Sequence, residues 1–92
     1  MVKHREHVLK ILPEFYQPVV DHKKPFEIRK NDRNFKVGDY VKLREYAPWL
    51  DGYTGNEAVE QITYMTDYHQ EPGYVVLGME LMFADTPNPG RV

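Results

Sequence analysis

The chain has no cysteine and no serine among its 92 residues. The missing cysteine excludes disulfide bonds and thiolate metal sites, and it makes a reducing compartment the first expectation. Because the two commonest nucleophiles are missing, covalent catalysis would have to use a threonine, a lysine or a carboxylate. No apolar run approaches the ~20 residues that cross a bilayer, and the polar first residues do not resemble a signal peptide. We therefore expect a cytoplasmic protein without membrane association.

The length predicts one domain over residues 1–92, with a core of about residues 6–82 and a flexible tail over residues 84–92. The net charge of −2 argues against a protein that coats nucleic acid along its whole surface. The charge is uneven, however. Residues 22–44 hold eight Lys or Arg and three Asp or Glu, whereas residues 45–90 hold no Lys or Arg and eight Asp or Glu. A local positive site is compatible with this pattern, and a solvated face is the alternative.

The apolar pattern predicts five strands and one short helix. Residues 7–12 alternate as a strand does. Pro13 can open a helix that Pro18 should either limit to about two turns or kink. Further strands are predicted over residues 25–30, 40–46, 56–68 and 74–81, with a helix as the competing interpretation of residues 57–62. The fold class is therefore mainly β (α+β), a small barrel of mostly antiparallel strands.

The basic segment over residues 23–39 carries the most informative pattern. Phe26 and Ile28 are expected on the buried face of a strand. Glu27 and Arg29 are then expected on the outward face. Arg29 could hold a phosphate or a base by two parallel hydrogen bonds, and Glu27 could accept from an exocyclic amine such as N4 of cytosine. The alternative is ordinary surface ion pairing, worth ~0–1 kcal/mol for each pair.

Two further lysines are candidates for phosphate contact or proton transfer, Lys10 and Lys24. If the strand of Lys10 is central, its ammonium must reach a cleft or pair with a carboxylate such as Glu27, because an unpaired buried charge is costly. An edge-strand lysine is the alternative. Arg44 lies on a strand face that interleaves rings and cations, which suits base stacking. Rings that cover an edge of the core are the alternative there.

The spacing of His4 and His7 could suit a metal, but no cysteine and no third ligand lie nearby. We therefore expect neither a metal site nor a cofactor. Four acidic residues are interpreted as solvated charges or charges at the barrel rim: Glu57, Glu60, Glu71 and Glu80.

Several separate segments, taken in order, resemble a known family. They are HVLKILP at residues 7–13, KKPFEIRKNDR at 23–33, VGD at 37–39, GYTG at 52–55 and GYVVLG at 73–78. Over about residues 6–81 the chain resembles the uncharacterised DUF3850 family, which is similar to the ASCH domains of the PUA-like superfamily. The resemblance implies a PUA-like pseudo-barrel of five to six strands, with one short helix between the first two strands.

ASCH domains are mostly proposed to bind RNA in a cleft lined by a strand with the motif G-x-K-x-x-E-x-R. Lys24, Glu27 and Arg29 match the lysine, glutamate and arginine of that motif. His22 replaces its glycine, and Pro25 stands where a threonine often follows. The resemblance therefore implies a module that binds RNA or a nucleotide. The expected contacts, including those argued above from the residues alone, are Lys10, Lys24, Glu27, Arg29 and Arg44.

Two other functions stay open. Some ASCH relatives look like small enzymes, including an amidohydrolase acting on N4-acetylcytidine and a proposed ribonuclease. If this chain were a hydrolase of a modified nucleoside or of RNA, Lys24 and Glu27 would be its general base and acid. Glu27 stands where that amidohydrolase has a threonine nucleophile, so binding is favoured over catalysis. The third possibility is a phage- or bacteria-encoded protein-interaction domain. A monomer or a weak dimer is expected.

Overall fold

The computed structural model describes residues 3–88 as one five-stranded sheet with a single short α-helix. The elements in chain order are β1 (Glu6–Ile11), α1 (Pro13–Val20), β2 (Phe26–Lys30), β3 (Tyr40–Ala47), the 3₁₀ turn η1 (Pro48–Leu50), β4 (Gly52–Thr66) and β5 (Tyr74–Asp85). The strand order is β1-β3-β4-β5-β2. β1 runs parallel to β3, and the other neighbouring strands are antiparallel.

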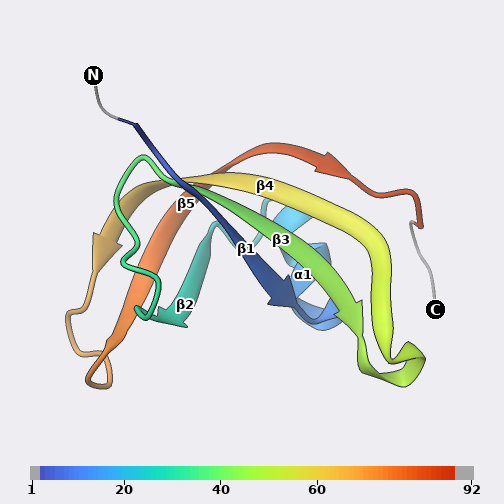
Figure 1. Cartoon of the computed structure of the whole chain (residues 1–92), viewed down its shortest axis with the longest axis horizontal. Helices are drawn as coiled ribbons and strands as arrows, with labels where there is room; N and C mark the ends of the chain where they lie inside the picture. The colour runs from blue at the N-terminus through green and yellow to red at the C-terminus, as the bar shows by residue number, and fades with distance from the viewer. Residues whose placement is uncertain (1–2, 89–92) are drawn as a thin grey trace.

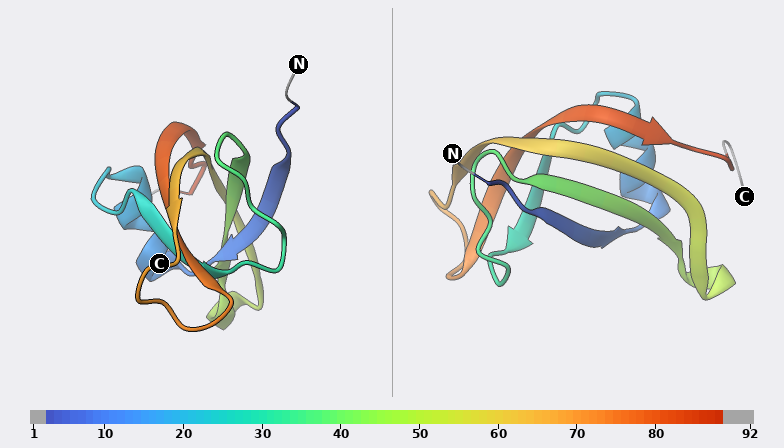
Figure 2. Two further views of the ribbon diagram at one scale, coloured as in Figure 1. Left: turned by 90° about the vertical axis from the view of Figure 1, so that its left-hand side faces the viewer. Right: turned by 45° about the horizontal axis from the view of Figure 1, so that its top comes forward.

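The sheet curls into a half-barrel, and α1 lies on its concave side (Figure 1). The curl is seen end-on in the left view of Figure 2. The expected mainly β fold, with one short helix between the first two strands, is therefore confirmed. Within residues 3–88, no helix combines the length and the apolar character that a membrane span requires.

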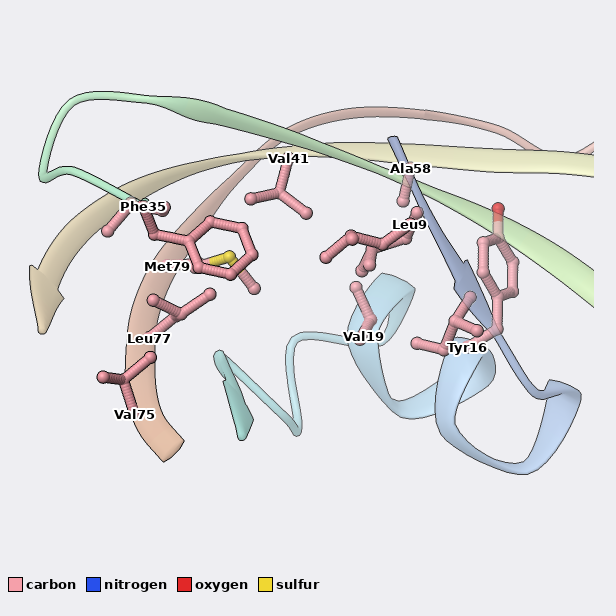
Figure 3. Packing of buried hydrophobic residues seen from close by; sticks show 12 residues of the cluster. Leu9, Tyr16, Val19, Phe35, Val41, Ala58, Val75, Leu77 and Met79 are labelled. Atoms are coloured by element: carbon pink, nitrogen blue, oxygen red, sulfur yellow. The ribbon is translucent and has the colours of Figure 1, made fainter. Parts of the chain in front are cut away.

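The core lies between the concave face of the sheet and one side of α1. Leu9 and Ile11 of β1 alternate inward, and Leu43 of β3 is fully buried. Tyr16 and Val19 turn from α1 toward the sheet, as Figure 3 shows. The Tyr16 hydroxyl also donates to the backbone oxygen of Glu57 on β4 (3.1 Å). This packing fixes α1, and with it the turn that leads into β2.

The two ends of α1 follow from its prolines and from the turn after it. Pro13 occupies the first turn, and the helix spans eight residues, which confirms the predicted two turns. After the helix, His22 adopts φ +60° and its amide donates to the backbone oxygen of Val19 (3.1 Å). The Lys23 amide donates to the backbone oxygen of Pro18 (2.8 Å). This is a Schellman motif, which usually has glycine at the left-handed position. It brings the next residues directly to β2.

The predicted faces of β2 are wrong, although the alternation itself is correct. Glu27 is buried at 4% exposure, whereas Phe26 is 39% exposed and Ile28 is 53% exposed. The inward-facing carboxylate has two cationic partners, one just before the strand and one within it. Lys24 and Arg29 both pair with the Glu27 carboxylate, and this pairing offsets the cost of burying its charge.

The last two strands are longer than predicted. Residues 57–62 belong to β4, so the competing helix is wrong. β5 continues past residue 81 to Asp85, because it pairs with β4 as far as Glu57. Beyond the strand, the Asn88 amide donates to Oδ1 of Asn56 (2.9 Å). The end of the predicted tail, residues 89–92, lies outside the described residues.

Candidate functional site

The two edge strands, β1 and β2, approach each other where the half-barrel nearly closes, and we call the gap between them the seam. No backbone ladder joins β1 to β2 within residues 3–88. Arginine side chains bridge the seam instead. Arg29 Nη2 donates to the backbone oxygen of Lys10 (2.9 Å), and Arg33 Nη1 donates to that of Val8 (3.0 Å). These guanidinium groups satisfy carbonyls that an edge strand would otherwise offer to another chain.

At one end the seam opens into a pocket of about 500 Å³, which we call the seam pocket. One side is the end of β1 and the start of α1, and the other is β2 with the residues before it. The lining residues are Ile11, Leu12, Phe15, Lys24, Phe26, Glu27, Ile28 and Arg29. The size lies within the usual range for small-molecule sites, which pair apolar walls with a few converging polar groups.

The polar part of the seam pocket is a three-residue ion cluster. Lys24 Nζ donates to Oε1 of Glu27 and also to the backbone oxygen of Phe26 (3.0 Å). Arg29 Nε donates to Oε2 of Glu27 (2.9 Å). One carboxylate therefore lies between two cations, and the cluster keeps a net positive charge. The structure thus brings together the three residues that match the G-x-K-x-x-E-x-R motif.

The remaining walls are apolar and partly exposed. Phe15 on α1 and Phe26 on β2 both present their rings to solvent, and Ile28 lies beside them. Lys24 Nζ lies 5.7 Å from the ring centroid of Phe15 and 5.2 Å from that of Phe26. Exposed apolar side chains gathered around a polar cluster are typical of a binding site rather than of ordinary surface.

The other two predicted contacts, Lys10 and Arg44, lie on the outer face of the sheet. They are register partners on β1 and β3. Lys10 Nζ stands 4.2 Å from the ring centroid of Tyr46, and Arg44 Cζ stands 4.0 Å from that of Tyr53. The alternative of an edge-strand lysine is confirmed, because β1 is at the edge of the sheet. Lys10 does not pair with Glu27, since Leu9 and Ile11 take the inward positions of β1 and leave Lys10 outward.

The two histidines whose spacing could suit a metal, His4 and His7, both lie near the carboxylate of Asp39. His7 is buried on β1, and its Nε2 donates to Oδ2 of Asp39 (2.8 Å). Burial alone would raise the pKa of Asp39, but hydrogen bonds from His7 and from the Arg5 and Lys36 amides outweigh it and lower the pKa. His4 is partly exposed, with Nδ1 3.9 Å from Oδ1 of Asp39. This arrangement ties β1 to the start of β3.

Sequence reasoning missed Glu60. The sequence predicts a solvated or rim charge, but Glu60 is 1% exposed on β4, and its Oε1 has no hydrogen-bond partner among the described residues. Burial raises its pKa to about 7, and the nearby Glu27 carboxylate adds to the rise while Lys24 opposes it. Its position between the buried Ala58 and Ile62 at strand spacing is the signal that could have placed it inward.

Comparison with known proteins agrees with the resemblance seen in the sequence. Residues 6–79 match the family described as "Domain of unknown function (DUF3850)". The chain is also similar to the "Uncharacterized 12.9 kDa protein in GpA 3'region" of Escherichia phage P2. The two are 37% identical over 62 residues, which make up 66% of this chain and 54% of the phage protein. The chain thus matches only about half the length of that relative. The chain belongs to the DUF3850 family.

Proposed function

We propose that the seam pocket binds a base of a nucleotide or of single-stranded RNA. The observation that carries this proposal is the convergence of Lys24, Glu27 and Arg29 in one pocket whose other walls are apolar and aromatic. A flat heterocycle needs apolar contact on its faces and hydrogen-bonding groups at its edge, and this pocket offers both.

The rings supply the first part of the binding energy. A base that stacks on an exposed aromatic side chain gains ~1–3 kcal/mol without regard to its identity. Phe15 and Phe26 are exposed at the pocket and come from different elements, so a base can reach both without unfolding the core.

The ion cluster supplies the second part. The Arg29 guanidinium holds Glu27 through Nε and the Lys10 carbonyl through Nη2. These two partners fix the orientation of the guanidinium. Its remaining N–H groups are thereby preorganised to donate to the edge of a base or to a phosphate oxygen. The net positive charge of the cluster favours a ligand that carries phosphate. The resemblance to ASCH domains, which are mostly proposed to bind RNA, supports the same reading.

The geometry favours binding over acid–base catalysis by Lys24 and Glu27. Both oxygens of Glu27 already accept from cations, one from Lys24 and one from Arg29. As a general acid, Glu27 would have to donate a proton, but both of its oxygens act as acceptors in this cluster. As a general base, Lys24 would have to accept a proton, but its Nζ donates to Glu27 and to the Phe26 carbonyl.

Fluorescence anisotropy with short labelled single-stranded RNA tests the proposal. Phe26→Ala and Arg29→Gln should each weaken binding by about tenfold, and the wild-type affinity should fall as salt rises. Arg44→Gln is the matched control, because it removes an arginine of the outer face. It should stay within about twofold of the wild type.

Arg29→Gln removes a bridge across the seam as well as a pocket contact. Phe26→Ala tests the pocket without removing that bridge, since the Phe26 ring is partly exposed. Two results would contradict the proposal. One is wild-type affinity in both pocket variants. The other is a loss confined to Arg44→Gln, which would assign nucleic-acid binding to the outer face.

A further inference from the structure

A second cavity lies beside the turn from α1 to β2 and shares no lining residue with the seam pocket. Its volume is about 320 Å³. The walls come from α1, from the turn, from β4 and from β5. The lining residues are Val19, His22, Pro25, Glu60, Met79, Glu80 and Leu81. The cavity therefore combines apolar walls with two carboxyl groups and one imidazole.

Glu60 is the unusual member of this set. Its side chain is buried, its Oε1 has no hydrogen-bond partner among the described residues, and it lines the cavity. A buried carboxylate without a partner is strongly disfavoured, so the group must either hold a proton or face a cation. Glu60 lines a cavity, which leaves room for that cation to come from a ligand.

The charges around Glu60 leave the cavity negative when Glu60 is ionised. Lys24 lies near Glu60, but its ammonium is already paired with Glu27, and Glu27 is paired with Arg29 as well. From β5, Glu80 adds a second carboxylate, and His22 contributes the remaining polar group from the turn. Val19, Met79 and Leu81 provide the apolar surface.

We propose that the second cavity binds a primary alkylammonium ion, with the ammonium group at the Glu60 carboxylate and the alkyl chain along the apolar wall. A primary ammonium carries three N–H donors, enough for the carboxylates of both Glu60 and Glu80. The alkyl chain contacts Val19 and Met79, which gives the site a preference over a bare metal cation. This inference is independent of the function proposed for the seam pocket.

Isothermal titration calorimetry with n-butylammonium tests the site in the intact protein. At pH 8.5 the wild type should bind, and at pH 5.5 the affinity should be about 30-fold lower, because the cation must then displace the proton of a carboxyl with a pKa of about 7. Below neutral pH, binding should also release protons, which buffers of different ionisation enthalpy reveal. Tetramethylammonium carries the same charge without an N–H donor and should not bind.

Variants locate the site. Glu60→Gln should abolish binding at both pH values, whereas Glu71→Gln, in the exposed turn before β5, should bind as the wild type does. In the unmodified protein, the carboxyl ¹³C signal of Glu60 should titrate at lower pH when butylammonium is present. That measurement holds even if Glu60→Gln folds poorly. No binding at pH 8.5, unchanged binding by Glu60→Gln, or tighter binding of methylguanidinium than of butylammonium would overturn the proposal.

Discussion

Replacing Glu60 by glutamine should change how the stability of the protein depends on pH. The carboxyl has an ordinary pKa of 4.5 when the chain is unfolded and about 7 when it is buried in the fold. The folded state therefore holds the proton more tightly than the unfolded state. The resulting stabilisation is complete below pH 4.5, declines between pH 4.5 and 7, and is gone above pH 7.

The size of this effect follows from the two pKa values. Between them, Glu60 should lower the free energy of unfolding by about 3 kcal/mol as the pH rises. Glutamine resembles the protonated carboxyl and does not ionise, so the variant lacks this decline. Between pH 4.5 and pH 8, the free energy of unfolding of Glu60→Gln should therefore rise by about 3 kcal/mol relative to that of the wild type.

Urea unfolding followed by circular dichroism at several pH values measures the difference directly. Subtracting the two curves removes the titration of all groups that the variants share, including Asp39 and the histidines. The plot of unfolding free energy against pH for Glu71→Gln should run parallel to that of the wild type, because Glu71 is exposed. Parallel curves for Glu60→Gln and the wild type would refute the assignment of a buried, proton-holding carboxyl at this position.

Three further predictions concern the seam, the β1 anchor and the turn after α1. Arg29→Ala should lower the free energy of unfolding by about 2–3 kcal/mol, because Glu27 loses one cation and the Lys10 carbonyl loses its donor; an unchanged urea midpoint would contradict the bridging role. Asp39→Ala should destabilise by about 3 kcal/mol at pH 7, since three donors lose their acceptor. Because the pKa of Asp39 is lowered in the fold, this stabilisation is present at pH values above the ordinary pKa of 3.8 and is lost at lower pH. The melting temperatures of the wild type and of Asp39→Ala should therefore converge near pH 2. A difference that stays constant with pH would contradict this role of the Asp39 carboxylate. His22→Gly should stabilise by about 1 kcal/mol, because glycine adopts the left-handed conformation without strain; a lower melting temperature would exclude that explanation.

The existence and order of the elements could be predicted from local patterns. Pro13 opens the helix, Pro18 near its end limits its length, and apolar residues at strand spacing mark the strands. The orientation of β2 could not be predicted in this way, because Phe26-Glu27-Ile28-Arg29 alternates equally well with either face inward. The surroundings of the strand decide it: Arg29, on the face of Glu27, donates to the Lys10 carbonyl of β1, while the two apolar side chains line a pocket.

The candidate site was likewise only partly predictable. The spacing of Lys24, Glu27 and Arg29 along one segment was enough to bring them together, since they are close in sequence. Lys10 and Arg44 are far from that segment in the chain, and their faces depend on which side of β1 and β3 meets the core. The burial of Glu60 could not be predicted from the sequence, because glutamate side chains are rarely buried in folded proteins.

Chemical-shift mapping tests the central claim, that the seam pocket is where a base-bearing ligand binds. ¹⁵N-labelled protein would be titrated with short single-stranded RNA while backbone amide signals are followed. Binding at the seam pocket predicts the largest shifts at the Phe15 amide and at the amides of residues 26–29, with the amides of Arg44 and Tyr53 on the outer face unchanged. Shifts confined to the outer face, or no shifts at saturating RNA, would contradict it.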